Sequence, residues 1–209
     1  MGLSDAFGKF IMPDIGAPGR KTDSSIFRDS EVGKRFYTNQ MNLSPPEAIY
    51  ENGPILPYYI IGNEGFPLEN FIMCPFPRRA NLSFRQKVFS YRLCRPRREV
   101  ECSFGMLVQR FRIFRQSIIA NVDTAKLIVK TAVCLHNFIL ERHRTIITDK
   151  NKDGFRKDSR IENYFESNEQ INNHPLQFQS ITIRKQLAEY FMRQGPVPWQ
   201  YQKVRNGDY

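Results

Sequence analysis

One segment, residues 83–114, constrains the fold most strongly because it carries a long helical pattern. Apolar residues recur in it at spacings of four, three, four and three positions, at Val100, Phe104, Leu107, Phe111 and Phe114. This period predicts a long amphipathic helix whose apolar stripe packs against a core. Pro96 lies inside the segment and predicts a kink or a break, because proline removes a helical hydrogen bond.

A second amphipathic helix is expected over residues 123–142, with Leu135 and Phe138 buried against the Phe104–Phe111 stripe. His136 lies in the same apolar setting, and we interpret it as a buried structural histidine in preference to a general base. Cys134 is likewise interpreted as a core thiol. The pair Cys134 and His136 would be only half of a zinc site, and no second half lies nearby in the sequence.

The N-terminal part alternates short β-favouring runs with loops rich in glycine and proline. Residues 7–12 predict a strand that ends in a turn, with a second strand over residues 14–19. Residues 23–25 are suited to cap a helix over residues 26–36. The run of residues 58–61 predicts a buried strand that ends at Gly62 and leads into a site. This order of strands and helices predicts a mixed fold of the α/β or α+β class.

Positive charge is concentrated in residues 78–115. Eleven Arg or Lys residues stand there against Glu99 and Glu101, so this stretch carries +9 of the formal net charge of +10. A basic segment with interleaved aromatic residues is typical of a surface that contacts nucleic-acid phosphates. The alternative is a solvated helix face that keeps the protein soluble. The candidate DNA-binding residues are Arg92, Arg95, Arg97 and Arg98.

Other features bear on the class of protein. No apolar run approaches the roughly 18 to 20 residues of a membrane span, and residues 1–10 lack the pattern of a secretory signal. The four cysteines form no C-x-x-C pair, so reduced thiols in a cytosolic or nuclear protein are expected. Residues 148–173 are polar and predict a linker, and residues 181–194 predict a short helix that ends at Gly195 and Pro196.

Several blocks of the sequence resemble the PIF/Harbinger transposases and their domesticated relatives, which are DDE superfamily endonucleases. The resemblance extends over about residues 5–141. It is carried, in family order, by PGRKTDSSIFRDS at 18–30, GNEGFPL at 62–68, FSYRLCRPRREVECSFGML at 89–107, and the downstream runs RFR at 110–112 and CLHNF at 134–138.

The resemblance implies an RNase H-like fold and a site of three carboxylates that hold a divalent metal, Mg²⁺ or Mn²⁺, for attack on a phosphodiester. One family carboxylate matches Glu101, and Asp23 lies in a further acidic family motif and is expected to support the site. The position of a second family Asp is Asn63, which keeps a carbonyl oxygen but loses the charge. Glu64 would point the other way on an extended strand.

The family block that contains the first-strand Asp is not found in the sequence, so we expect an RNase H-like fold that lacks its first strand. Residues 1–145 are then a partial DDE endonuclease domain, and residues 146–209 are a polar linker with a short C-terminal helix. Glu101 has an alternative interpretation as a helical ion pair with Arg97, four positions earlier.

Two functions of different classes follow from the resemblance. The first is a transposase-derived, metal-dependent DNA endonuclease domain, here truncated and catalytically impaired. The second is a non-catalytic DNA- or protein-binding module domesticated from such a transposase. Both imply non-specific DNA contact through the basic stretch and a nuclear, or else cytoplasmic, location. Relatives commonly use a separate Myb-like partner, and such a partner is expected to supply any sequence-specific reading of DNA.

Overall fold

The computed structural model describes residues 1–78, 81–150 and 179–207 and has an α+β architecture. The elements are, in chain order, β1 (Gly2–Ser4), β2 (Phe10–Pro13), α1 (Asp23–Asp29), α2 (Glu31–Tyr37), β3 (Glu47–Ala48), β4 (Ile55–Leu56), β5 (Ile60–Ile61), β6 (Ile72–Met73), α3 (Phe84–Arg110), the 3₁₀ helix η1 (Arg112–Arg115), α4 (Val122–Lys150), α5 (Ser180–Arg193) and α6 (Gln200–Arg205). None of the described helices is long and apolar enough to cross a membrane.

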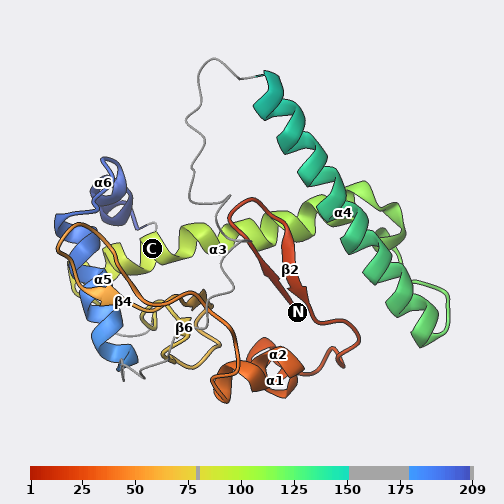
Figure 1. Ribbon diagram of the computed structural model, residues 1–209, viewed down its shortest axis with the longest axis horizontal. Coiled ribbons are helices and arrows are strands. Elements are labelled where there is room, and N and C mark those ends of the chain that lie inside the picture. The colour runs from red at the N-terminus through yellow and green to blue at the C-terminus, as the bar shows by residue number, and fades with distance from the viewer. Residues whose placement is uncertain (79–80, 151–178, 208–209) are drawn as a thin grey trace.

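Helix α3 runs through the middle of the structure, and most other elements are arranged along it (Figure 1). Ser83 begins the helix with a capping box, in which its side chain and that of Gln86 satisfy each other's backbone N–H groups. Of the two outcomes predicted at Pro96, a kink or a break, the break does not occur, because the helix continues from Phe84 to Arg110. The missing hydrogen bond is tolerated because buried residues lie on both sides of the proline, Leu93 before it and Leu107 after it.

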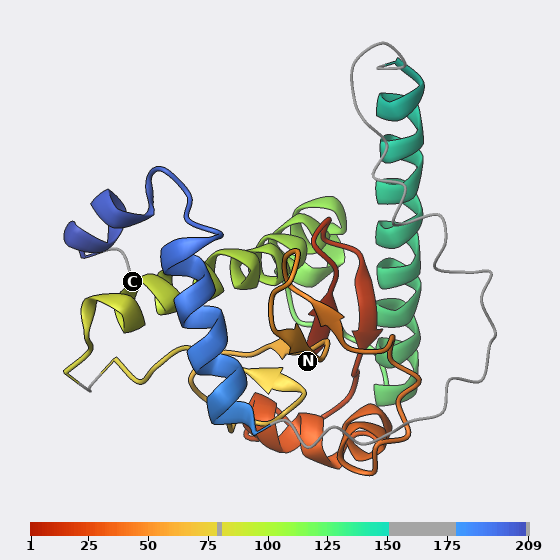
Figure 2. The ribbon, with the colours of Figure 1, turned by 60° about the vertical axis from the view of Figure 1, so that its left-hand side comes forward.

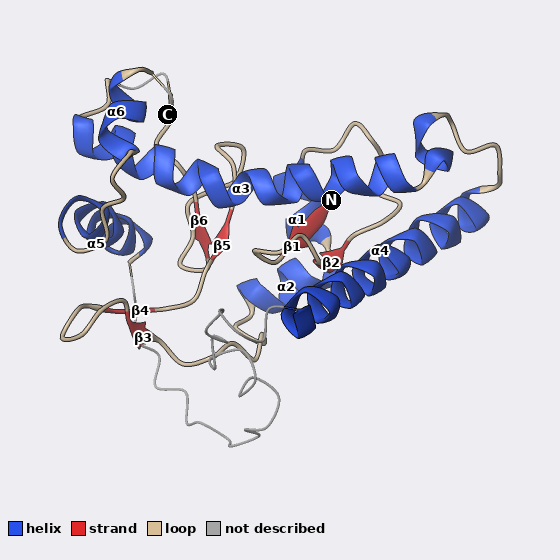
Figure 3. Cartoon of the chain, turned by 90° about the horizontal axis from the view of Figure 1, so that it is seen from above, coloured by secondary structure: helices blue, strands red, loops and turns tan. Residues whose placement is uncertain are grey.

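The described strands form three separate two-stranded sheets. β1 and β2 are antiparallel, with Leu3 opposite Met12, and β3 and β4 are antiparallel as well. β5 and β6 are parallel, with Ile60 opposite Ile72. Figure 3 shows the β1–β2 and β5–β6 pairs lying beside α3 at successive positions along it. The described strands therefore do not join into the single mixed sheet expected of an RNase H-like fold.

The N-terminal strands are shifted from their predicted positions. The strand predicted over residues 7–12 begins only at Phe10, because Gly8 lies in a turn at a φ of 82°. Its partner is the preceding segment Gly2–Ser4, and residues 14–19 form no strand. The strand predicted over residues 58–61 is confirmed for Ile60–Ile61.

The core is built in two clusters at successive positions along α3. In its N-terminal half Phe89 and Leu93 pack with Leu56, Met73 and the α5 residues Ile183, Leu187 and Ala188. Figure 2 shows α5 lying across α3. Near its C-terminal end Leu107 packs with Phe10 of β2 and with Ala132 and Val133 of α4. The predicted C-terminal helix is thus part of the core, and residue 145, the expected domain boundary, lies inside α4. The polar linker predicted over residues 148–173 lies, from residue 151 on, outside the described residues.

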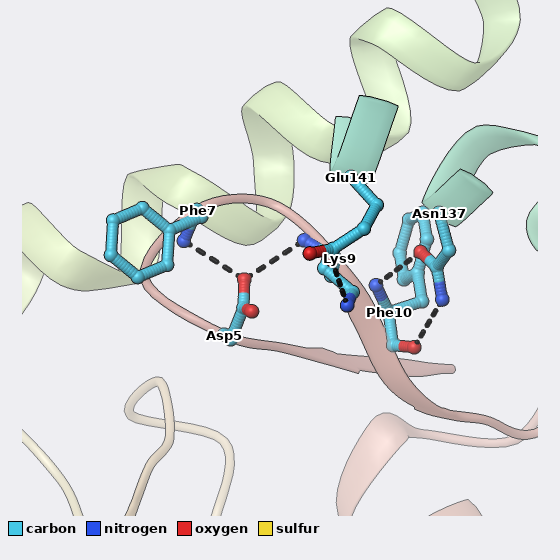
Figure 4. A network of polar contacts seen from close by, with 6 residues as sticks. All are labelled: Asp5, Phe7, Lys9, Phe10, Asn137 and Glu141. Atoms are coloured by element: carbon cyan, nitrogen blue, oxygen red, sulfur yellow. Dashed lines mark hydrogen bonds and ion pairs between the residues drawn. The ribbon is translucent and has the colours of Figure 1, made fainter. Parts of the chain in front are cut away.

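Helix α4 is fixed to the β1–β2 hairpin by polar contacts (Figure 4). The Asn137 side chain accepts a hydrogen bond from the Phe10 backbone N–H at 2.9 Å and donates one to the Phe10 carbonyl at 2.8 Å. Lys9 and Glu141 form an ion pair at 2.6 Å. The Asp5 carboxylate closes the hairpin turn by accepting hydrogen bonds from two backbone N–H groups.

These contacts decide which face of α4 is buried, and the prediction for Leu135 and Phe138 is wrong. Their exposed fractions are 45% and 57%. Asn137 must face the hairpin, so Ala132, Val133 and His136 turn inward and the two larger side chains turn away. Cys134 is exposed for the same reason, which corrects its prediction as a core thiol. All four cysteines of the chain are described and free.

Candidate functional site

A cavity of about 420 Å³ brings together residues that are far apart in the sequence. Asp23, Asn63 and Glu101 all line it, together with Arg97. Its walls come from β1, α1, the end of β5 and the middle of α3, and they are largely apolar, with Phe27 at the α1 side. The three candidate site residues from the sequence therefore lie around one cavity.

Asp23 is the first residue of α1. The single helix predicted over residues 26–36 is divided at Ser30 into α1 and α2, and the cap predicted at residues 23–25 is instead Thr22, whose hydroxyl oxygen accepts a hydrogen bond from the Ser25 N–H at 3.3 Å. This leaves the Asp23 carboxylate available at the exposed start of the helix, where a negative charge is favoured by the helix dipole. Helix α1 ends at Ser30, which also caps α2, so the two short helices are held as one corner.

Asn63 follows β5 directly after Gly62. Its Oδ1 accepts a hydrogen bond from the Gly65 backbone N–H at 2.8 Å, which forms a tight turn at the end of the strand. An aspartate could make the same turn, but the amide brings no charge to the cavity. The local fold therefore explains why a short polar side chain suits this position, and the loss of charge remains as a chemical difference from the family pattern.

Glu101 makes an ion pair with Arg97, one turn earlier on α3. The helical ion pair that was the alternative interpretation of Glu101 is therefore present. Both residues of the pair also line the cavity. The Glu101 side chain is more than half exposed, so the contribution of the pair to stability is small, about 0.3 to 0.5 kcal/mol. The pair has a larger effect on chemistry, because the Arg97 guanidinium contacts the Glu101 carboxylate oxygen that could otherwise bind a metal ion.

The described residues do not fit the three-carboxylate metal site that the sequence resemblance implies. This cavity has two carboxylates, Asp23 and Glu101, and the Glu101 carboxylate is paired with Arg97. Within the described ranges no group of three or more His, Cys, Asp or Glu side chains is placed to hold a metal ion. No catalytic step through a metal is therefore derived from this cavity.

The four candidate DNA-binding arginines have different surroundings. Arg92 is half-buried, and it donates hydrogen bonds to the Gly195 carbonyl at 2.6 Å and to Gln200 Oε1 at 2.9 Å. Burial lowers the pKa of its guanidinium. Arg92 therefore joins α3 to the C-terminal segment. Arg97 is paired with Glu101, whereas Arg95 and Arg98 are exposed.

Other basic residues of the stretch also divide into paired and unpaired groups. Arg78 is paired with Glu64, and Arg85 with Glu189. The arginines of this stretch that are exposed and have no acidic partner among the side chains the structure describes are Arg95, Arg98, Arg110, Arg112 and Arg115, of which Arg110 contacts His136. Arg112 and Arg115 were not singled out from the sequence, because charge counting cannot tell a paired arginine from an unpaired one.

His136 is a structural residue, as the sequence indicated. It is fully buried, its Nε2 is 3.1 Å from the Gly8 carbonyl oxygen, and its Nδ1 is 3.2 Å from an Arg110 nitrogen. A carbonyl needs a donor and a guanidinium needs an acceptor, so both contacts fit the neutral ring with its proton on Nε2. Burial is the main cause that lowers the pKa of His136, and the charge of Arg110 adds to it. The histidine does not line the cavity of Asp23 and Glu101.

Comparison with known proteins gives one match. Residues 1–137 match the model of a family described as DDE superfamily endonuclease. The matched range includes every residue of the cavity and ends within α4, so α5 and α6 lie outside it. No curated protein and no solved structure matches the chain.

Proposed function

The chain belongs to the DDE superfamily endonucleases, and on that premise we propose that it is a transposase-derived domain that binds DNA along α3 and does not cut DNA by itself. The observation that carries the proposal is the cavity that combines the family positions with only two carboxylates and an arginine. The assignment to the PIF/Harbinger branch, with an RNase H-like ancestry and a nuclear location, is part of the proposal and is supported by the sequence blocks.

Unpaired arginines support DNA as the ligand. Arg95 and Arg98 lie on α3 near the cavity residues Arg97 and Glu101, and Arg112 and Arg115 lie in η1, which follows α3 directly. Phosphate groups release condensed counterions when such side chains neutralise them, which makes binding favourable and independent of sequence. Sequence-specific reading is assigned to a separate Myb-like partner in this proposal.

The contribution of these arginines can be measured from the salt dependence of binding. If about five phosphates are neutralised, a plot of log K for duplex DNA against log salt should have a slope of about −4 to −5. The double variant Arg95→Gln/Arg98→Gln should reduce the magnitude of this slope by about 2, since two contacts are lost. The control Lys130→Gln/Arg205→Gln removes the same charge from exposed positions elsewhere and should leave the slope unchanged. Equal slopes for all three proteins would contradict binding along α3.

A second candidate function, metal-dependent cutting of DNA, is favoured by the placement of Asp23 and Glu101 on one cavity. We expect no detectable nuclease activity from the chain with Mg²⁺ or Mn²⁺, because two carboxylates cannot hold two metal ions about 3.5 to 4 Å apart. The measurement is conversion of supercoiled plasmid by the purified chain. Cutting that is abolished both by EDTA and by Glu101→Gln would replace the proposed function with this one.

A further inference from the structure

A second cavity, of about 380 Å³, lies next to the first one and has a different chemistry. Ile61 of β5 lines both cavities, so they are neighbours along β5 and α3. The second cavity is lined by Arg92 and Arg95 of α3, by Tyr59, and by Trp199. It combines guanidinium groups with aromatic rings, and none of the described residues that line it is acidic.

We propose that this second cavity binds one nucleotide of a single DNA strand, with the base on the Trp199 ring and its phosphate at Arg95. The proposal rests on the proposed function only in taking DNA as the ligand. It adds to that function a site for an unpaired nucleotide beside the cavity of Asp23 and Glu101.

Trp199 is placed as a stacking surface. Its exposed fraction is 47%, although the next residue, Gln200, is fully buried. The Gln200 side chain donates to the Phe191 carbonyl at 2.7 Å and accepts from Arg92 at 2.9 Å. These contacts fix the turn before α6, so the Trp199 indole is exposed to solvent while its backbone is held in place. Bases of a single strand stack on such rings regardless of sequence, because every base has a π-face.

Arg95 supplies the charge for a phosphate. Its guanidinium carbon lies over the Trp199 ring, 5.6 Å from the ring centre, and the indole is still 47% exposed, so a base stacked on the exposed part of the ring would have its phosphate within reach of Arg95. The only hydrogen bond that the structure describes for Arg95 goes to the Tyr91 hydroxyl, at 3.2 Å, which leaves most of its donors free. Tyr59, which also lines the cavity, is half-buried, and burial raises its pKa to about 12, so this ring stays neutral at any physiological pH.

This arrangement favours a nucleotide over an acidic peptide. A carboxylate side chain would use Arg95 but would gain little from an exposed indole, whereas a nucleotide offers a planar base and an anion that are joined by a short sugar. The C-terminal segment that supplies Trp199 lies outside the range matched by the family. The proposed site therefore combines residues from inside the matched range, Arg95 among them, with Trp199 from outside it.

Trp199 is the sole tryptophan of the chain, so its fluorescence reports contact with a base directly. The full chain is titrated with a twelve-residue oligothymidylate, with an abasic strand of equal length and charge, with thymidine monophosphate, with the matching duplex and with a polyglutamate peptide. We expect saturable quenching by the oligothymidylate and little by the abasic strand or the duplex. Quenching that is as strong with free nucleotide or with polyglutamate would overturn the assignment to a DNA strand.

Variants then test the residues. With labelled oligothymidylate, Trp199→Leu should weaken binding about tenfold, the size expected for losing one base–aromatic stack. Arg95→Gln should weaken it further and reduce its salt dependence, whereas Phe138→Leu, which alters an exposed aromatic residue on α4, should have no effect. Duplex binding without any quenching by the oligothymidylate would refute the nucleotide site and leave the proposed function intact. Absence of binding to every DNA probe would refute both.

Discussion

Phe89→Ala should destabilise the protein by about 3 to 5 kcal/mol, because it removes a large buried ring that the surrounding structure cannot replace. Phe89 is fully buried in the second turn of α3, with its ring centre 5.5 Å from that of Phe76 and 6.0 Å from that of Phe191 on α5. The measurement is the free energy of unfolding from urea titrations of the parent and the variant, with the slope m compared to check that both unfold in the same way.

Phe138→Ala is the matched control, since it removes the same ring from an exposed position on α4. Its ring contacts Arg142, at 5.4 Å from the guanidinium carbon, and such exposed contacts contribute little. We expect a loss of less than about 1 kcal/mol. A control that loses as much as Phe89→Ala would show that the outer face of α4 is covered in solution, as its apolar sequence alone predicted.

The contrast between these two phenylalanines shows what the sequence could and could not predict about the fold. The long helical periods of residues 83–114 and 123–142 predicted α3 and α4, because sustained periodicity is a strong signal. The buried face of α4 was not predictable, because apolar side chains lie on more than one face and the hydrogen bonds of Asn137 to Phe10 select between them. Those hydrogen bonds join residues that are 127 positions apart, so a local sequence pattern cannot predict them.

The same limit explains which parts of the candidate sites were found. Asp23, Asn63 and Glu101 came from the family resemblance, which supplies residues but not geometry, and the structure places them on one cavity. Trp199 was not predicted as a site residue, because its role depends on contact with Arg95, which lies more than a hundred positions earlier in the sequence. Arg92 was included among the DNA contacts on charge alone, and its hydrogen bonds to Gly195 and Gln200 instead give it a structural role.

The C-terminal segment packs against α3 next to the second cavity. Ile183 and Leu187 of α5 pack with Phe89 and Leu93 in the N-terminal half of α3, about four to five turns before Leu107 on the same helix face. The range matched by the family ends before these α5 residues, so this part of the α3 packing comes from outside it. Since α5 also leads into the turn that carries Trp199, the packing of this helix positions the second cavity relative to the first.

The corner between α1 and α2 determines where Asp23 stands, and it depends on a glycine. A Cβ atom added to Gly33 would lie 1.8 Å from the Phe27 carbonyl oxygen, and this neighbour is backbone that cannot rotate away. The same carbonyl accepts a hydrogen bond from the Ser30 hydroxyl at 2.6 Å, and the hydroxyl oxygen accepts from the Gly33 N–H at 2.9 Å. Close approach of the two helices therefore requires the absence of a side chain at position 33.

Gly33→Ala should accordingly cost about 3 kcal/mol of stability, at the upper end of the usual cost of overpacking, because backbone must move to admit the methyl group. Gly105→Ala is the control: Gly105 lies on α3 with no atom within 4 Å of the added Cβ, so the alanine should stabilise the helix by about 0.5 to 1 kcal/mol. Urea unfolding of both variants measures the two changes in the free energy of unfolding, which we expect to have opposite signs. If Gly33→Ala were neutral, α1 would not be held against α2 as described, and the position of Asp23 on the cavity would lose its structural basis.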